Sequence, residues 1–386
     1  MKIGMFTDTY YPQINGVATS VLILKQQLEL AGHSVHIFTT TNANVMDEEK
    51  GVYRVPSIPF SSVGRIGFFY PPAVFKVIKK MQLDVIHVHT EFPMGILGYR
   101  AAKKLNLPLV HTMHTLYEDY THYIFKFTSL EKKAKPLARK LCAISCNRAD
   151  QVIAPTGKTR DLLISYGVHR DISMIPTGIN LDQFSPTKIN PQKLAKLRTE
   201  LGIAPNDKIL VNIGRISKEK NLSEILETMR VYLPRHKDVK LLLVGDGPAK
   251  QDLEIMTKTF GLQEQVIFAG PQPWEQIGSY YSLGHIFVGA SQSETQGLTY
   301  IEALASGLPV VAKADPCLEG VVKDGVNGYT FHDRKQFIQI LDIVLGDQQY
   351  HTRLSKQALQ SCAAFTAANF AQSIEEIYRT RTKKAN

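Results

Sequence analysis

The sequence predicts an α/β protein made of two doubly wound domains in series. Its 386 residues exceed what one hydrophobic core usually fills, and 44% hydrophobic with 21% charged residues is an ordinary globular composition. In both halves, short β-branched runs alternate with amphipathic helical stretches, which is typical of parallel βαβ units. We therefore expect one Rossmann-like domain over residues 1–180 and another over 181–386.

The strands and helices of the first half can be placed one by one. The run KIGMFT predicts a strand, and a helix is expected over 17–31, closed by Gly32. Further strands are expected at HSVHIFTT, DVIHVH, PLVHTMH and QVIAP, with helices between them. The segment 179–186, INLDQFSP, is interpreted as a linker because a glycine-containing turn precedes it and a proline ends it.

A second βαβ series follows this segment. Its expected strands are KILVNIG, KLLLVGDG, QVIFAG, HIFVGAS and LPVVAK. Two such domains place the carboxyl ends of their strands across a cleft, where doubly wound sheets bind ligands. Whether the last helix, FAQSIEEIYRTRTKK, crosses back to the first domain stays open at this point.

Composition and charge exclude several classes of protein. The net charge is +10, of which +7 lies in residues 1–185, so an anionic partner is expected. Zinc-finger spacing, an RNA-binding strand motif and a helix-turn-helix pattern are all missing, which argues against nucleic acid. The four cysteines lack metal-ligand spacing and are expected to be free thiols.

The N-terminus and the hydropathy pattern predict where the protein works. MKIGMFTDTYYP fits neither a signal peptide nor a transit peptide, and no stretch approaches the ~20 apolar residues of a spanning helix. We expect a cytoplasmic protein that is not an integral membrane protein.

The strongest motif of the second half is SQSETQGLTYIEALASGLPVV, in which Glu294 and Glu302 flank an expected helix start near Gly297. The unpaired N–H groups of such a start suit a phosphate. Glutamates that only stabilise the helix dipole would give the same pattern. Arg215 and Lys220, which follow strand KILVNIG, favour the phosphate interpretation because two cations there can neutralise a diphosphate leaving group. A solvated surface pair is the alternative.

Two negative observations narrow the chemistry of this half. VGDGP lacks the third glycine of the dinucleotide fingerprint, so no NAD site is predicted. An Asp-x-Asp pair is missing from the whole sequence, so we expect that no metal is essential and that Arg215 and Lys220 stabilise the departing charge.

The first half contributes two candidate residues at strand ends. Gly16 follows strand one and precedes a helix, which lets the backbone approach a ligand closely. A simple turn is the alternative. His114 ends PLVHTMH, where an imidazole can hydrogen-bond a sugar hydroxyl or stabilise charge. A satisfied core histidine is the alternative.

A basic amphipathic stretch over residues 130–141 suggests contact with an anionic membrane. Leu130, Ala134, Leu137 and Leu141 share one face, and Tyr117, Tyr120, Tyr123, Phe125 and Phe127 precede the stretch. Pro136 is expected to kink the helix or mark its start. A surface helix packed on the domain by its apolar face is the alternative. The basic residues of the stretch are Lys132, Lys133, Lys135, Arg139 and Lys140.

Together, YYPQINGVATSV, HTMHT, GRISKEKN and SETQGLTYIEALASGLPVV resemble the retaining GT-B glycosyltransferases of family 4 over nearly the whole chain. The resemblance implies a nucleotide-sugar donor and roles for the quoted residues. Gly16 would abut the diphosphate, Arg215 and Lys220 would bind it, and Glu294 would contact the transferred sugar. Glu302 would bind the ribose, His114 the sugar hydroxyls near the reacting carbon, and the segment that contains Gly297 and Leu298 the donor. Asn15 replaces a glycine common in the family, which makes the phosphate contact of Gly16 less secure.

HTEFPMGILGYRAAKK, with HTMHTLYEDYTHYIF and DPCLEGVVKDGVNG, resembles a narrower subgroup, the 1,2-diacylglycerol 3-glucosyltransferases. That implies transfer of glucose from UDP-glucose to a lipid acceptor by an enzyme peripheral to the inner face of the cell membrane. Phosphatidylinositol or a soluble sugar as acceptor, GDP-mannose as donor, a nucleotide-sugar epimerase and a non-catalytic anion- or lipid-binding protein are the alternatives.

Overall fold

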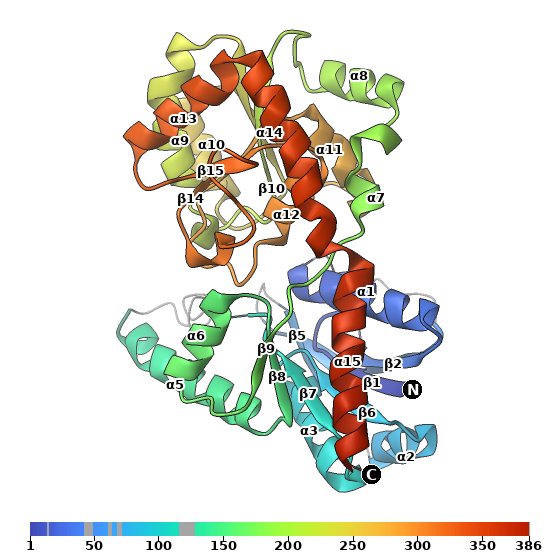
Figure 1. Ribbon diagram of the computed structural model, residues 1–386. Helices are drawn as coiled ribbons and strands as arrows, with labels where there is room; N and C mark the ends of the chain where they lie inside the picture. The colour runs from blue at the N-terminus through green and yellow to red at the C-terminus, as the bar shows by residue number, and fades with distance from the viewer. Residues whose placement is uncertain (14, 42–48, 61–63, 68–71, 116–127, 386) are drawn as a thin grey trace. The chain divides into compact units, whose positions relative to one another are not determined.

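The computed structural model describes residues 1–13, 15–41, 49–60, 64–67, 72–115 and 128–385. The chain forms two compact units, Met1–Gly178 together with Ala367–Asn386, and Ile179–Thr366 (Figure 1). Each unit contains a parallel sheet with apolar cores on both of its faces, so the predicted α/β, doubly wound fold class is confirmed.

The first unit is built on a seven-stranded sheet in the order β3-β2-β1-β6-β7-β8-β9. All of its neighbouring strands are parallel, and the order reverses between β1 and β6. Its strands are β1 (Lys2–Phe6), β2 (Ser34–Thr40), β3 (Val52–Val55), β6 (Val85–Val88), β7 (Leu109–Thr112), β8 (Gln151–Ala154) and β9 (Ile172–Met174). A separate antiparallel pair is formed by β4 (Ser57–Phe60) and β5 (Gly64–Gly67).

Helices from both ends of the chain cover one face of this sheet. Helix α1 (Gly16–Leu30) packs beside the last helix, α15 (Ala367–Ala385), and both contribute to one apolar core (Figure 1). Ile374 and Tyr378 of α15 are completely buried in that core. The other helices of the unit are α2 (Pro72–Met81), α3 (Pro93–Leu105), α5 (Thr128–Asn147) and α6 (Gly157–Ser165).

The second unit contains a six-stranded parallel sheet in the order β12-β11-β10-β13-β14-β15. Its strands are β10 (Lys208–Ile213), β11 (Val239–Val244), β12 (Val266–Gly270), β13 (Ile286–Gly289), β14 (Val310–Lys313) and β15 (Gly328–Phe331). Its helices are α7 (Leu181–Phe184), α8 (Pro191–Glu200), α9 (Leu222–Tyr232), α10 (Lys250–Thr259), α11 (Ile277–Leu283), α12 (Leu298–Ala305), α13 (Arg334–Gly346) and α14 (Gln348–Ser361).

The expectation that residues 179–186 form a linker is wrong. Leu181–Phe184 is a short helix, capped by the side chain of Asn180. Phe184 is completely buried and its ring packs edge-on against Trp274 and Tyr281. Burying a Phe side chain contributes roughly 1.5–3 kcal/mol, which is why this polar-looking segment belongs to the core of the second unit.

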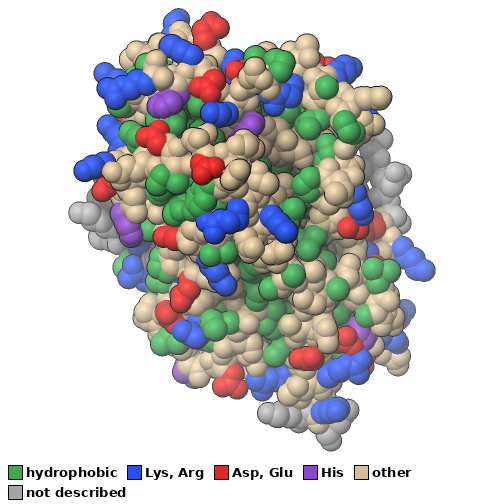
Figure 2. Space-filling view, turned by 45° about the horizontal axis from the view of Figure 1, so that its top comes forward, with side chains coloured by type: hydrophobic (Ala, Val, Ile, Leu, Met, Phe, Trp, Pro, Cys, Tyr) green, Lys and Arg blue, Asp and Glu red, His purple; other side chains and the backbone are tan. Residues whose placement is uncertain are grey.

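The distribution of surface charge, the state of the cysteines and the length of the helices can be compared with what the composition predicts. On the face seen in Figure 2, Lys and Arg side chains are interspersed with Asp and Glu rather than gathered in one patch. All four cysteines are buried, and none of them forms a disulfide. Within the described ranges, no helix is long and apolar enough to cross a membrane.

Candidate active site

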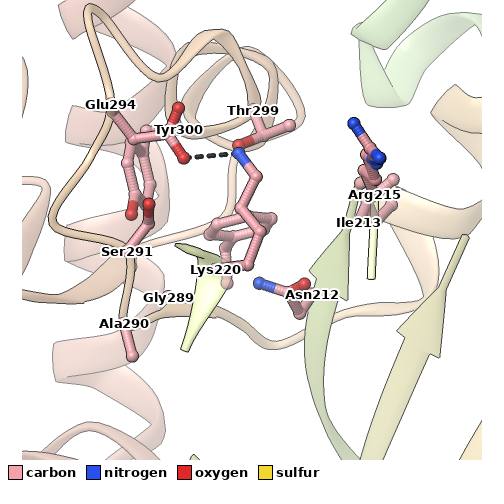
Figure 3. Close-up of a pocket in the computed structure, with 12 residues that line it drawn as sticks. Asn212, Ile213, Arg215, Lys220, Gly289, Ala290, Ser291, Glu294, Thr299 and Tyr300 are labelled. Carbon is pink, nitrogen blue, oxygen red and sulfur yellow. Dashed lines mark hydrogen bonds and ion pairs between the residues drawn. The ribbon is translucent and has the colours of Figure 1, made fainter. Parts of the chain in front are cut away.

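Three candidate residues of the second unit, Arg215, Lys220 and Glu294, line one pocket at the carboxyl end of its sheet (Figure 3). The other candidates of this unit, Gly297, Leu298 and Glu302, are not among its lining residues. The end of β10, the turn that follows it, the loop after β13 and the first turn of α12 form the walls. Carboxyl ends of parallel strands are the usual ligand-binding edge of such sheets. The lining residues are Asn212, Ile213, Gly214, Arg215, Lys220, Phe287, Gly289, Ala290, Ser291, Glu294, Thr299 and Tyr300.

Lys220 and Glu294 form an ion pair inside this pocket. The side chains retain 26% and 16% of their exposure, so the pair is largely shielded but still open to a ligand. Lys220 ends a 3₁₀ turn, Lys218–Lys220, and the Ser291 hydroxyl donates to the Glu219 carbonyl of that turn at 3.1 Å. The loop after β13 therefore holds the turn that carries Lys220.

Arg215 lies on the other side of Lys220 from Glu294 in the view of Figure 3. It follows Gly214, whose φ of +146° favours glycine. A Cβ on Gly245 would lie 1.9 Å from the Gly214 carbonyl oxygen, so only glycine allows the loops after β10 and β11 to approach so closely. The VGDGP segment thus supports the backbone from which Arg215 extends.

The start of α12 is shaped around the ring of Tyr300. Gly297 adopts the left-handed conformation, with φ of +72°, directly before the helix. A Cβ at Gly297 would come within 2.5 Å of the Tyr300 ring, and one at Gly289 within 2.8 Å. Leu298, the first helical residue, packs against the apolar core. Two glycines therefore make room for a buried tyrosine that fixes the helix start facing the pocket.

Glu302 lies one turn further along α12 and is 4% exposed. The Tyr281 hydroxyl donates to its Oε2 at 2.7 Å. Burial raises the pKa of Glu302 to about 7, against the opposing effects of that hydrogen bond and of the nearby Lys220 charge. This carboxyl group therefore titrates near neutral pH.

Gly16 belongs to the first unit, at the first position of α1. Its neighbour Asn15 caps the helix, since Oδ1 accepts from the Ala18 amide at 2.9 Å. The Asn15 amide also donates to the Thr9 hydroxyl at 2.7 Å. Asn15 thus has a structural role of its own as the cap of α1.

His114 lies two residues beyond β7 in the first unit, and its Nε2 is 3.0 Å from Nδ1 of His89. Burial, together with the neighbouring His111, lowers the pKa of His114 to about 3, so the ring is neutral at physiological pH. His111 has other partners: its Nε2 is 3.0 Å from Glu91 and its Nδ1 is 3.0 Å from the Tyr99 hydroxyl.

The basic stretch lies in α5, which runs through Pro136 without ending there. Ala134 is buried, whereas Leu137, Leu141 and Ile144 are 56%, 54% and 39% exposed. Arg139 and Lys140 are exposed beside them, and Lys135 is half-buried. Lys132 and Lys133 belong to the helix, but their side chains, like the five preceding aromatic residues, lie outside what the structure describes.

Several residues that line the pocket are not singled out by the sequence analysis. Asn212 is a polar residue inside an apolar strand, and its amide donates to the Val288 carbonyl of the neighbouring β13 at 2.7 Å. A polar residue within an apolar strand is a signal in the sequence from which Asn212 could have been predicted. Ser291, Thr299 and Tyr300 lie inside the motif that contains Glu294 and Glu302, but their positions in the pocket wall depend on packing and hydrogen bonds that no local pattern reveals. In the described part of the chain, no group of three or more His, Cys, Asp or Glu residues could hold a metal ion.

Two family models cover most of the chain. Residues 14–183 match "Glycosyltransferase Family 4", and residues 195–361 match "Glycosyl transferases group 1". The chain belongs to glycosyltransferase family 4 and is a glycosyltransferase.

Named relatives and a solved structure extend this classification. The chain is 40% identical to the alpha-monoglucosyldiacylglycerol synthase of Streptococcus pneumoniae, over 98% of this chain and 85% of the relative. It is 33% identical to the synthase of the same name from Acholeplasma laidlawii, over 100% and 98%. HepE from Anabaena, solved with UDP and glucose, shares the fold with a TM-score of 0.79 at 22% identity, over 98% and 100% of the two chains.

Proposed function

We propose that this enzyme transfers glucose from UDP-glucose to diacylglycerol, with retention of the anomeric configuration, at the surface of a membrane. The observation that carries the proposal is the pocket that Arg215, Lys220 and Glu294 line. It lies in a chain that aligns over 98% and 100% of its length with two alpha-monoglucosyldiacylglycerol synthases. Two cations beside a carboxylate suit a donor that has a diphosphate next to a sugar.

The proposed reaction assigns one task to each group. The bond between the anomeric carbon and the β-phosphate oxygen breaks, and Arg215 and Lys220 stabilise the charge that develops on the departing diphosphate. The diacylglycerol hydroxyl attacks from the same face through an oxocarbenium-like state, and its proton passes to the leaving phosphate. Glu294 accepts hydrogen bonds from the transferred sugar, and Glu302 from the ribose. His114 hydrogen-bonds a hydroxyl of the transferred sugar near the reacting carbon. Because these cations provide the positive charge, we expect turnover to persist in the presence of EDTA.

The direct test incubates the purified protein with UDP-glucose and diacylglycerol in anionic vesicles. Mass spectrometry follows the glycolipid, an enzymatic assay follows UDP, and NMR reports the anomeric configuration. An α-glucosyl lipid formed together with UDP is the expected result. UDP without glycolipid would redirect the search to soluble-sugar or phosphatidylinositol acceptors, and neither product would point first to GDP-mannose and then to a binding protein.

Donor binding should depend on pH through Glu302. The raised pKa means that the carboxyl group is mostly protonated below about pH 7. The protonated group is neutral and is a weaker hydrogen-bond acceptor than the carboxylate. We expect UDP-glucose to bind roughly tenfold more weakly at pH 6 than at pH 8, as measured by calorimetry without acceptor. UDP-glucose has no phosphate group that titrates in this range. In Glu302→Gln the dependence should disappear, and an unchanged slope in that variant would assign it to another group.

Membrane association should depend on α5. Leu137, Leu141 and Ile144 recur at helical spacing and are exposed, so this apolar stripe does not pack on the domain. Exposed apolar side chains beside Arg139 and Lys140 suit the interface of an anionic bilayer, where each basic residue contributes roughly 1 kcal/mol. The five-residue variant that replaces Lys132, Lys133, Lys135, Arg139 and Lys140 with Gln should bind anionic vesicles at least ~100-fold more weakly in co-sedimentation.

A charge-matched variant controls for nonspecific electrostatics. It replaces five exposed lysines of the second unit and changes the net charge by the same amount. Those lysines are Lys237, Lys258, Lys323, Lys335 and Lys356. Donor hydrolysis should be unaffected in both variants, and only the α5 variant should lose vesicle binding. Equal losses would show that net charge, rather than α5, determines association.

A further inference from the structure

Four histidines cluster at the carboxyl end of the first sheet, on and just beyond two adjacent strands. His87 and His89 come from β6 and the residue after it, and His111 and His114 from β7 and the segment after it. The His87 and His89 rings lie 4.0 Å apart, and the His89 and His114 rings 5.3 Å apart. Of these four histidines, the proposed function gives a role only to His114, which leaves the role of its neighbours to be explained.

The first ring of this series is fixed on both sides. His87 Nδ1 is 2.6 Å from the Tyr378 hydroxyl of α15, and His87 Nε2 is 2.7 Å from the Thr112 hydroxyl. His87 is completely buried, and its ring packs against that of His89. The plane of the His89 ring is therefore set by a neighbour that cannot easily rotate.

The bond between His89 and His114 requires one donor and one acceptor. Burial lowers the pKa of both rings, so each is neutral and carries one proton. Either His89 donates from Nδ1 to Nε2 of His114, or His114 donates from Nε2 to Nδ1 of His89. The two arrangements place the proton of His114 on different nitrogens.

The second nitrogen of His89 discriminates between the arrangements. His89 is 2% exposed, and its Nε2 has no hydrogen-bond partner among the described residues. If His114 were the donor, Nε2 of His89 would carry a buried N–H without an acceptor, which folded proteins avoid most strongly. If His89 is the donor, Nε2 carries only a lone pair.

We propose that His89 is a positioning residue that donates from Nδ1 to His114 Nε2 and thereby holds His114 with its proton on Nδ1. His114 then acts as a hydrogen-bond donor through Nδ1. Its catalytic consequence rests on the proposed function, in which His114 contacts a hydroxyl of the transferred sugar. A fixed tautomer removes the need to reorganise the ring when the donor binds.

The test reads the tautomer directly, by ¹⁵N NMR of the histidine rings in the full-length protein, with His114→Gln used to assign the His114 signals. His114 should be protonated at Nδ1 and not at Nε2 between pH 6 and 8. His89→Asn, whose amide nitrogen can replace Nδ1 as a donor, should preserve this state, and His89→Leu should change it to the Nε2 form or a mixture. Protonation of wild-type His114 at Nε2 would overturn the proposal, as would an unchanged tautomer in a folded His89→Leu.

Kinetics separate this inference from the proposed function. We expect kcat/KM for glucosyl transfer to fall about 10- to 100-fold in His89→Leu, with most of the loss restored in His89→Asn. If the tautomer is as expected but no glucolipid forms with any variant, the proposed function fails and the assignment of His89 stands. If His89→Leu does not fold, the spectra of the wild type and His89→Asn still show whether His114 carries its proton on Nδ1.

Discussion

Replacing Lys220 with alanine should reduce kcat about 100-fold or more. Lys220 lies in the pocket at the carboxyl end of the second sheet, held beside Glu294 by a turn that the Ser291 hydroxyl anchors. Removing one preorganised group that stabilises developing charge typically costs 10²–10³ in kcat. Arg215→Ala should have a similar effect, because it removes the other cation of the pocket. The measurement is steady-state glucolipid formation at saturating UDP-glucose.

Lys218→Ala is the matched control for this experiment. Lys218 lies in the same 3₁₀ turn but is exposed and does not line the pocket. Its replacement should leave kcat unchanged, which would show that the loss in Lys220→Ala is not a general effect of altering the turn. Near-normal rates in both Lys220→Ala and Arg215→Ala would contradict the assignment of a diphosphate to this pocket.

Replacing Glu294 should distinguish two mechanisms. If its carboxylate binds sugar hydroxyls, Glu294→Ala should lower kcat/KM about 100-fold, since hydrogen bonds to a charged group contribute roughly 1.5–3 kcal/mol. Glu294→Gln keeps the shape and one acceptor oxygen, so about a tenth of the wild-type activity should remain. A covalent nucleophile could not be replaced by an amide, and Glu294→Gln would then be inactive.

The control for Glu294 is Glu227→Ala, which removes an exposed glutamate paired with Arg334. Exposed ion pairs contribute little, so this variant should match the wild type. Mass spectrometry of peptides from enzyme quenched with UDP-glucose gives a second measurement. A glucosylated Glu294 peptide would overturn same-face attack in favour of double displacement.

The fold class could be predicted because periodicity is a local property of the sequence. Long strands such as β10 and β11 stand out as nearly continuous apolar runs, since both of their faces are buried. The outer strands Val52–Val55 and Gly328–Phe331 were missed because they are only partly buried and lack the continuous apolar run by which the inner strands are recognised. The helix at 181–184 was missed because the partners of its buried Phe184, Trp274 and Tyr281, are about 90 residues away.

Some residues of the candidate site could be predicted from the sequence and others could not. Lys220 and Glu294 stand out in the sequence because charged residues follow apolar strands there, and the structure brings them together across 74 positions. Tyr300 could not be found, because its importance lies in the space that Gly289 and Gly297 leave for its ring. The hydrogen bond between His89 and His114 likewise depends on the pairing of two strands, which the sequence does not specify.

The position of α15 has a consequence for the order in which the protein folds during synthesis. Its residues Phe370, Ile374 and Tyr378 fill one core of the first unit, yet the ribosome makes them only after the whole of Ile179–Thr366. The second unit is continuous in the sequence and has all of its own strands before α15 emerges. The first unit, although translated first, therefore leaves the core that contains Tyr10, Val21 and Leu24 incomplete until Ala367–Ala385 has been made.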